Sequence, residues 1–525
     1  MTGARARSAG TDGPERGPAT EAPAAAADRR AAADRPDDGA AARGPGPTRR
    51  LSYGRRLALI TVAGALLRVV LGARQGLGYD EDFTAVAVSH PLTETLRIVS
   101  RDSAPPLFYV LEHLAAGFGG GPWNLRLVPI AAGIALIPLL AALGRRVGGE
   151  AAGLWTAAFV AMLPATLFSS TNARMYGPAA MLIVAAILLL WRALERPGGR
   201  RWIAFAAVAA AAVWTDYFAA VALAGVVLAA AWFRPPGRVY AAACLSFAAA
   251  LASLLPWLVY AGDQLSHTGQ GFWVAPLSPA TLIGTAGQLF AGPETQADAP
   301  LWGILISLQV VAALAGWLTL AGLAIRRGRL SPEVRRRALF CLLGCGGVVA
   351  MVAVSVWRPL LDARYAGIMW LPLFALAGLG LASLPRRPAL ALLAAVAVPS
   401  LALSIAATRP GVLDLLPEIE ARVGPHDLVD ADPDHYLLML AEGSPSVVAR
   451  LHVLAAADPP WYFGTAAYPP GAVVGAVPRD VIASGGSIFY VGDRGSSPSL
   501  LPPGYREREL RCASETCLAV YGPGG

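Results

Sequence analysis

Long apolar runs separated by short polar segments fill the chain from about residue 57 to residue 407. The first run covers about residues 57–73. Ten further runs follow at about 124–143, 152–170, 177–194, 202–216, 218–233, 239–260, 301–325, 338–357, 365–384 and 388–407. An α-helix needs about twenty apolar residues to cross a hydrocarbon core. The pattern therefore predicts a polytopic α-helical membrane protein with about eleven spans.

Composition agrees with a membrane protein. Hydrophobic residues make up 55% of the chain and charged residues only 15%, which is far more typical of a polytopic membrane protein than of a soluble one. All 43 basic residues are arginine, and together with heavy use of Ala, Gly and Pro this is typical of a GC-rich genome. The net charge of +8 therefore gives no support to a nucleic-acid partner.

The segment before the first apolar run has almost no large apolar side chains. Residues 1–50 consist mainly of Ala, Gly, Pro, Arg and Asp, so they cannot bury enough surface to offset the entropy of ordering. We expect a disordered tail there and a retained membrane anchor after it. A cleaved signal peptide is the alternative, because Leu71-Gly72-Ala73 resembles a cleavage site, but a leader of this length would be unusual.

Arginines predict the orientation of the spans. They gather in alternate connections, at 145–146, 192–201, 234–238, 326–337 and 386–387. The positive-inside rule places these connections, and the N-terminal tail with them, in the cytoplasm. An odd number of spans then puts the C-terminus on the extracytoplasmic side, together with the polar residues of the opposite connections.

The first outer loop, residues 74–123, gathers acidic residues beside the membrane. It holds Tyr79-Asp80-Glu81-Asp82 and then Asp102, which precedes Pro105-Pro106. Ionisable groups near a bilayer are costly unless they face water, a partner or a substrate. Helical spacing of apolar residues in 92–99 and 107–118 predicts two short helices that lie along the interface. The loop therefore predicts chemistry at the outer membrane surface.

Two Arg–Tyr sites interrupt the apolar pattern at other outer ends. Arg174 and Tyr176 form the first, Arg364 and Tyr365 form the second, and Arg126 stands ahead of Pro129. Guanidinium groups bind phosphate oxygens bidentately, so these arginines are candidate phosphate ligands. Snorkelling to the interface and structural pairing are the alternatives.

Asp216 divides an apolar stretch of about thirty residues. Carboxylates inside a membrane usually have a functional role, which makes Asp216 a candidate site residue. The alternative is a polar turn between two short spans.

Residues 409–525 have a different character and predict a small α/β domain. The runs at 446–449, 472–477 and 487–491 are strand-like and are bounded by Pro, Gly and Asp. Cys512 and Cys517 flank a hairpin tip, where an extracytoplasmic location favours a disulfide over two unpaired thiols. The acidic group from Asp430 to His435 contains Pro433, so we expect a solvated turn there rather than a metal site.

In their order along the chain, these motifs resemble the family 39 polyprenyl-phosphate-dependent membrane glycosyltransferases. This group contains the dolichyl-phosphate-mannose protein mannosyltransferases and the aminoarabinose transferases, and it has the GT-C fold. The resemblance covers about residues 57–407. The motifs that carry it are Gly78-Tyr79-Asp80-Glu81, Asp102 with Pro105–Tyr109, Leu125–Pro129, Ala173–Tyr176, and Pro359 with Arg364-Tyr365.

The resemblance implies transfer of a mannose-like or pentose-like sugar from a polyprenyl phosphate to an extracytoplasmic glycan, lipid or protein, with inversion. Asp80 would be the general base, with Glu81 and Asp102 as further catalytic acids. Arg174 and Arg364 would neutralise charge on the leaving phosphate. The remaining site residues are Tyr176, Tyr365 and Arg126 as donor-phosphate contacts, and Tyr109 and Asp216 as candidate substrate contacts.

Two questions stay open in this interpretation. Many relatives have a His where this chain has Asp216, which leaves the choice of donor or acceptor open. Some relatives use a divalent metal ion beside the acids, but no ligand set in the sequence requires one. The expected location is the bacterial plasma membrane.

Another class of protein, a lipid or glycan transporter or flippase, would also need many spans. The sequence has no internal repeat of the kind such carriers often show. A catalytically silent homologue is a third reading, and the presence of both Asp80 and Asp102 argues against it.

Overall fold

The computed structural model describes residues 51–74, 76–119, 121–262, 264, 273–291, 331–406 and 411–524. The tail predicted for residues 1–50 and the span expected at 301–325 lie outside the described residues. The chain from Leu51 onward forms one compact unit.

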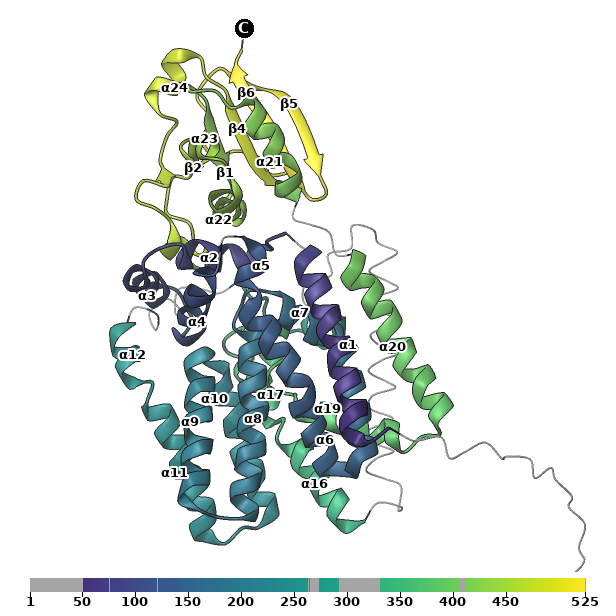
Figure 1. Cartoon of the computed structure of the whole chain (residues 1–525). Helices are drawn as coiled ribbons and strands as arrows, with labels where there is room; N and C mark the ends of the chain where they lie inside the picture. Colours follow the sequence, from purple (N-terminus) through teal and green to yellow (C-terminus); the bar gives the residue numbers. More distant parts are fainter. Residues whose placement is uncertain are drawn as a thin grey trace, which may run out of the picture. The chain divides into compact units, whose positions relative to one another are not determined.

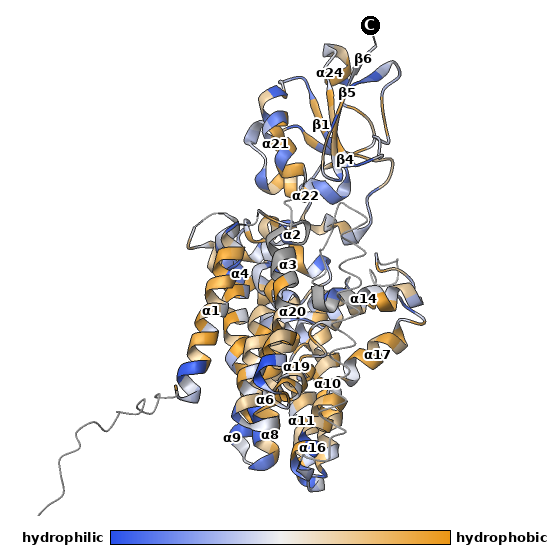
Figure 2. Ribbon diagram, turned by 90° about the vertical axis from the view of Figure 1, so that its right-hand side faces the viewer, coloured by the Kyte–Doolittle hydropathy of each residue, from blue (hydrophilic) through white to orange (hydrophobic). Residues whose placement is uncertain are grey.

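Helices fill the apolar part of the chain (Figure 1). They are α1 (Tyr53–Arg74), α6 (Leu127–Met162), α7 (Pro164–Thr171), α8 (Tyr176–Glu195), α9 (Gly199–Thr215), α10 (Phe218–Ala230), η1 (Ala231–Phe233), α11 (Gly237–Ala252), α12 (Leu255–Tyr260), α14 (Pro279–Ala291), α16 (Pro332–Leu343), α17 (Gly346–Val354), α18 (Ala363–Ala366), α19 (Pro372–Ala382) and α20 (Arg386–Ala406). Each predicted apolar run within the described residues coincides with helix. Figure 2 shows hydrophobic residues along α1, α10 and α17, with hydrophilic ones at the ends of α8 and α9.

Within the described part of the chain, five helical segments are long and apolar enough to cross a membrane. They are Tyr53–Arg74, Leu127–Met162, Tyr176–Glu195, Gly237–Tyr260 and Pro332–Val354. Shorter apolar helices accompany them, among them Phe218–Phe233 and Pro372–Ala382. The multi-pass helical architecture is therefore present, while the count of about eleven spans stays a prediction.

Helix α6 contains two of the predicted runs, joined at a glycine turn. Gly148 and Gly149 have non-helical backbone angles, and Gly149 has a φ of +83°, where a side chain would be strained. A Cβ on Gly153 would lie only 2.8 Å from the carbonyl oxygen of Ala141. The two halves therefore fold back on each other and pack at backbone distance, as the separate runs predicted.

Arg68, on α1, is fully buried and bonds to carbonyl groups at the break between α6 and α7. Pro164 begins α7 and has no N–H to offer the carbonyl of Val160. Arg68 donates from Nη2 to Val160 O at 3.3 Å, from Nη1 to Ala161 O at 3.1 Å and from Nε to Ser170 Oγ at 3.0 Å. A buried arginine thus donates hydrogen bonds to the carbonyl groups at the helix break and holds α1 against α6 and α7.

Four short helices form the first outer loop: α2 (Tyr79–Val88), α3 (Leu92–Arg101), α4 (Leu107–Ala116) and α5 (Pro122–Leu125). The two helices predicted for this loop are confirmed by α3 and α4. The acidic motif does not stand in an open loop, because Tyr79-Asp80-Glu81-Asp82 is the first turn of α2.

The C-terminal region, residues 411–524, holds one six-stranded sheet with strand order β3-β2-β1-β4-β6-β5. Its strands are β1 (Leu428–Ala431), β2 (Leu451–Leu454), β3 (Val473–Val474), β4 (Ile488–Asp493), β5 (Tyr505–Ala513) and β6 (Thr516–Pro523), and its helices are α21 (Gly411–Arg422), α22 (Pro433–Glu442), α23 (Pro445–Val448), η2 (Trp461–Phe463), η3 (Thr465–Ala467) and α24 (Arg479–Ser484). The strands β3, β2, β1 and β4 are parallel, and β6 is antiparallel to both β4 and β5.

Two local predictions for this region were wrong. The run at 446–449 falls largely in α23 rather than in a strand, because Ser444 and Pro445 begin a helix there. The acidic group around Pro433 is not a solvated turn. Asp430 is 2% exposed in the buried strand β1, and Pro433 begins α22.

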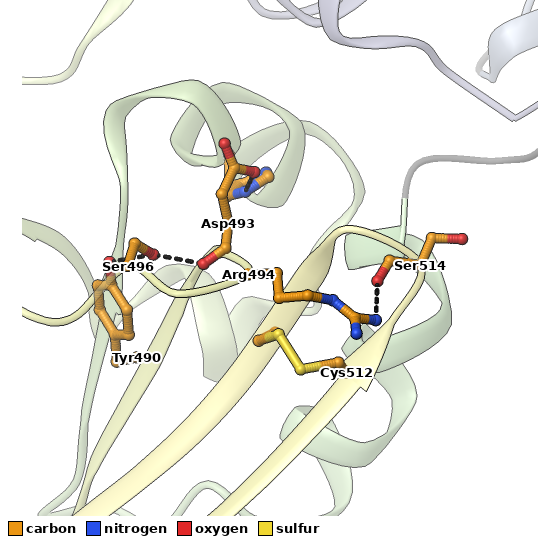
Figure 3. Close-up of a disulfide and its surroundings, with 8 residues drawn as sticks. Tyr490, Asp493, Arg494, Ser496, Cys512 and Ser514 are labelled. Carbon is orange, nitrogen blue, oxygen red and sulfur yellow. Dashed lines mark hydrogen bonds and ion pairs between the residues drawn. A yellow bond between two sulfur atoms is a disulfide. The ribbon is translucent and has the colours of Figure 1, made fainter. Parts of the chain in front are cut away.

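The predicted disulfide is confirmed. Cys512 and Cys517 are bonded across the β5–β6 hairpin. Arg494 lies beside them in Figure 3 and donates to the carbonyl of Ser514 at 2.8 Å. The covalent bond and this contact fix the turn that joins the last two strands.

Helix α22 of the C-terminal region packs on α2 of the first outer loop. Phe83 and Leu437 belong to one buried apolar cluster that draws on both regions. Gly464 has a φ of +69°, and a Cβ there would lie 2.9 Å from Phe83. Only glycine fits this contact, which places the C-terminal region directly on the helix that begins with the acidic motif.

Candidate active site

A buried ion pair joins Glu81 to Arg126. The side chains are 3% and 1% exposed, and Arg126 donates from Nε to Glu81 Oε1 at 2.7 Å and from Nη2 to Glu81 Oε2. Arg126 also donates to the carbonyls of Gly72 at 2.9 Å and Gly76 at 2.6 Å. The carboxylate in turn accepts from the backbone N–H of Ala173 at 2.7 Å.

This geometry changes the interpretation of both residues. The pair ties together the end of α1, the start of α2, the start of α6 and the turn before α8. Because Glu81 and Arg126 have several protein partners and almost no exposure, their geometry is that of a structural ion pair that holds these elements together. The structure thus gives both residues a structural role, while the catalytic role of Glu81 and the phosphate contact of Arg126 stay predictions.

Asp80 precedes Glu81 in the first turn of α2. Its side chain lies outside the described part of the structure, so its role as the base stays a prediction. The Glu81–Arg126 pair fixes the backbone turn that carries it.

Arg174 lies with two of the other predicted site residues. Its Nη1 donates to the hydroxyl of Tyr109 at 3.3 Å, and its guanidinium carbon is 6.0 Å from the centre of the Phe83 ring. Asp216 lies within the electrostatic range of the same guanidinium. Residues from α2, α4, the turn before α8 and the end of α9 thus converge on one arginine.

Asp216 ends α9 and is 2% exposed. Its Oδ1 accepts from the backbone N–H of Phe218 at 2.8 Å, which caps the start of α10. Its Oδ2 is buried and has no hydrogen-bond partner among the described residues. Asp216 can therefore have both of the roles considered from the sequence. Its Oδ1 stabilises the turn between α9 and α10, and its Oδ2 makes no hydrogen bond to the described residues.

Arg364 and Tyr176 line a second, narrow pocket, between α6, α7, α8 and α19. Arg364 Nε lies 4.0 Å from Asp362 Oδ1, and the Arg364 guanidinium stands 5.1 Å from the centre of the Trp273 ring. Tyr365 stacks on Phe218, with ring centres 4.4 Å apart. The other lining residues are mostly apolar, among them Leu136, Ala165, Phe168, Ala180, Ile368, Leu371 and Phe374. The pocket combines one cation with a surface suited to hydrocarbon.

Asp102 follows α3 and is 7% exposed. Ser103 Oγ lies 3.4 Å from its Oδ2. The carbonyl groups of Val99 and Ala104, on either side of Asp102, accept hydrogen bonds from the side chain of Gln264.

Sequence reasoning missed the residues that support this loop. Gln264 is bonded to Tyr217, and Tyr217 is bonded to Trp257. The only signal in the sequence was that Tyr217 follows Asp216 at the break in the apolar pattern.

A large cleft lies between the first outer loop and the C-terminal region. Helices α2, α3 and α4 line one side, and the end of α22 and residues 466–470 line the other. Its polar lining side chains include His90, Glu94, Arg101, His113, Glu442 and Tyr468. Among the described residues, no group of three or more His, Cys, Asp or Glu side chains is gathered in a way that could hold a metal ion.

A family model matches part of the chain. Residues 102–260 match the family described as dolichyl-phosphate-mannose-protein mannosyltransferase. No curated protein matches the chain.

Two solved structures share the fold. ArnT from Cupriavidus metallidurans in the apo state is 15% identical, with a TM-score of 0.61 over 89% of this chain and 98% of that chain. The same protein bound to undecaprenyl phosphate is 15% identical, with a TM-score of 0.56 over 90% of this chain and 98% of that chain. The family match over residues 102–260 agrees with the resemblance seen in the motifs, and the two solved structures show that the chain shares their membrane-protein fold.

Proposed function

We propose that this protein is an inverting membrane glycosyltransferase that moves a mannose-like or pentose-like sugar from a polyprenyl phosphate to an extracytoplasmic acceptor. The observation that carries the proposal is the convergence of Arg174, Tyr109 and Asp216 beside α2, the helix whose first turn carries Asp80. A cation, a phenol and a carboxylate at this place suit the cleavage of a sugar–phosphate bond. The family match over residues 102–260 supports the same reaction class.

The donor would be held by two arginines. Arg174 and Arg364 each offer a guanidinium that can donate to phosphate oxygens. The apolar pocket beside Arg364 and Tyr176 suits the first isoprene units of a lipid carrier. The ArnT structure that shares this fold was solved with undecaprenyl phosphate, which supports a lipid phosphate as the ligand.

In the reaction, the acceptor hydroxyl would give its proton to the carboxylate of Asp80. The hydroxyl oxygen then bonds to the anomeric carbon from the face opposite the phosphate. The bond from that carbon to the phosphate oxygen breaks, and the leaving phosphate keeps the electron pair. Arg174 and Arg364 would stabilise the charge that develops on it.

We expect this site on the extracytoplasmic face of a bacterial plasma membrane, with the N-terminus in the cytoplasm, and the arginine distribution supports that orientation. The acceptor would enter through the cleft between the outer loop and residues 411–524. The C-terminal region would then bind the acceptor and take no part in the chemistry.

The test is sugar transfer by the purified protein in liposomes that contain radiolabelled polyprenyl-phosphate sugars. Asp80→Asn should lower turnover by about 10²–10⁴-fold, the usual contribution of a general base, while donor binding persists. Asp458→Asn changes an exposed acid of the C-terminal region and is the matched control.

Near wild-type turnover of Asp80→Asn would move the base to Asp102. Movement of labelled lipid across the bilayer without any transfer would instead support the transporter or flippase read from the sequence.

A further inference from the structure

Three side chains form a continuous hydrogen-bonded chain below the Asp102 loop. Trp257 Nε1 donates to the hydroxyl of Tyr217 at 2.8 Å, and that hydroxyl donates to Gln264 Oε1 at 2.6 Å. Gln264 Nε2 donates to Val99 O at 2.7 Å and to Ala104 O at 3.2 Å. The chain therefore begins on α12, passes through the first residue after Asp216, and ends on both sides of Asp102.

The geometry fixes the orientation of each group. The amide of Gln264 uses its oxygen and both hydrogens, because its oxygen accepts from Tyr217 and its nitrogen serves two carbonyls. A flipped amide would point its oxygen at those carbonyls. Gln264 and Trp257 are each 6% exposed, so water cannot easily replace the bonds.

We propose that Tyr217, Trp257 and Gln264 are positioning residues that hold the loop of residues 99–104, and with it the carboxylate of Asp102, for sugar transfer. The catalytic part of this inference rests on the proposed function. The part that concerns the order of the loop does not.

The break between α9 and α10 also connects the two sides of the site. Asp216 lies within the electrostatic range of Arg174, and the next residue, Tyr217, supports the Asp102 loop. One dipeptide thereby fixes the separation between the phosphate-binding side and the second acid. A displacement of about 1 Å in such a constellation can lower a rate about a hundredfold.

The test compares Tyr217→Phe and Gln264→Glu with Tyr260→Phe in the full-length protein in liposomes. Tyr260 lies on α12 and is 58% exposed, and its ring lies 5.5 Å from that of Trp257, so its variant loses the same hydroxyl but keeps the ring beside Trp257. We expect kcat to fall about ten- to a hundredfold in the first two variants, with an unchanged KM for the donor. Gln264→Glu should regain part of its kcat at acidic pH, because only a protonated carboxyl group can donate to Val99 or Ala104.

Amide hydrogen exchange supplies a readout that does not depend on catalysis. Residues 99–104 should exchange faster in Tyr217→Phe and Gln264→Glu than in the wild type or in Tyr260→Phe. If the wild type transfers no sugar, the proposed function fails and this measurement alone decides the proposal.

Unchanged exchange in residues 99–104 would overturn the positioning role. So would a loss of kcat that tracks a general loss of folded protein, or a Gln264→Glu variant whose kcat does not recover at acidic pH. If Gln264→Glu does not fold, Tyr217→Phe carries the test, because it removes a single oxygen atom.

Discussion

The Glu81–Arg126 pair offers the sharpest test of how the site is built. Glu81→Gln keeps the size of the side chain and one acceptor oxygen but removes the charge. In either orientation an NH₂ group then faces one guanidinium nitrogen of Arg126 and one backbone N–H, that of Gly78 or that of Ala173, to which Glu81 now bonds at 2.8 and 2.7 Å. The guanidinium, 1% exposed, then loses the charge of Glu81.

The expected loss follows from this burial. Breaking a buried ion pair by removing one partner costs about 3–5 kcal/mol, because a desolvated charge is left uncompensated. The matched control is Glu150→Gln, since Arg145 and Glu150 are paired at 3.3 Å but are each 53% exposed. Exposed pairs contribute only about 0–1 kcal/mol. We therefore expect a large effect in the first variant and almost none in the second.

The assay is reversible unfolding in mixed detergent micelles, with sugar transfer measured on the same samples. A double-mutant cycle with Arg126→Gln should give a coupling of the same order as the single loss, because each variant removes the same contact. The reasoning is refuted if Glu81→Gln is as stable as the wild type and loses only transfer. That result would restore the catalytic role predicted for Glu81 from the sequence.

Three further predictions follow from the site and the C-terminal region. Arg174→Ala and Arg364→Ala should each weaken donor affinity about ten- to a hundredfold, because a charge-assisted hydrogen bond contributes about 1.5–3 kcal/mol. Arg200→Ala, which changes an exposed arginine, should leave donor affinity unchanged. Binding isotherms of labelled donor measure these affinities, and equal values for all variants would support snorkelling. Burial raises the pKa of Asp430 from 3.8 to about 7, so between these pH values the folded state holds a proton that the unfolded chain releases. The free energy of unfolding should therefore fall as the pH rises from 3.8 to about 7. Asp430→Asn should flatten this dependence when unfolding is measured over a series of pH values. A membrane-impermeant maleimide should label Cys512 on intact cells after the disulfide is reduced, with the Cys512→Ser variant as control. Labelling only after lysis would contradict the extracytoplasmic location of the C-terminal region.

The sequence by itself determined the elements whose cause is local. An apolar run of membrane length must form a helix, because no water is present to satisfy its backbone groups. Helices α3 and α4 follow from apolar spacing behind proline, and the Cys512–Cys517 bond follows from two cysteines at a hairpin tip. The motif order from Asp80 to Arg364 indicated the family.

Local pattern failed where a partner from elsewhere decided the outcome. Asp430 reads as a turn residue beside Pro433, yet its strand is buried between β2 and β4, and its Oδ1 accepts from the backbone N–H of Leu454 at 2.9 Å. In the sequence Arg68 is a single polar residue within a span. Its hydrogen-bond partner Ser170 lies 102 positions away, so the local pattern does not identify it.

Only the tertiary structure decided what the polar residues of the site do. Glu81 and Asp80 are equivalent in the sequence. In the structure Glu81 forms an ion pair with Arg126, 45 positions away, so the charges of Glu81 and Arg126 compensate each other. Gln264 has no signal in the sequence, and its bond to Val99 spans 165 positions. Desolvation makes such long-range pairing obligatory for a buried polar group, but it does not specify the partner, which is fixed only when the helices pack.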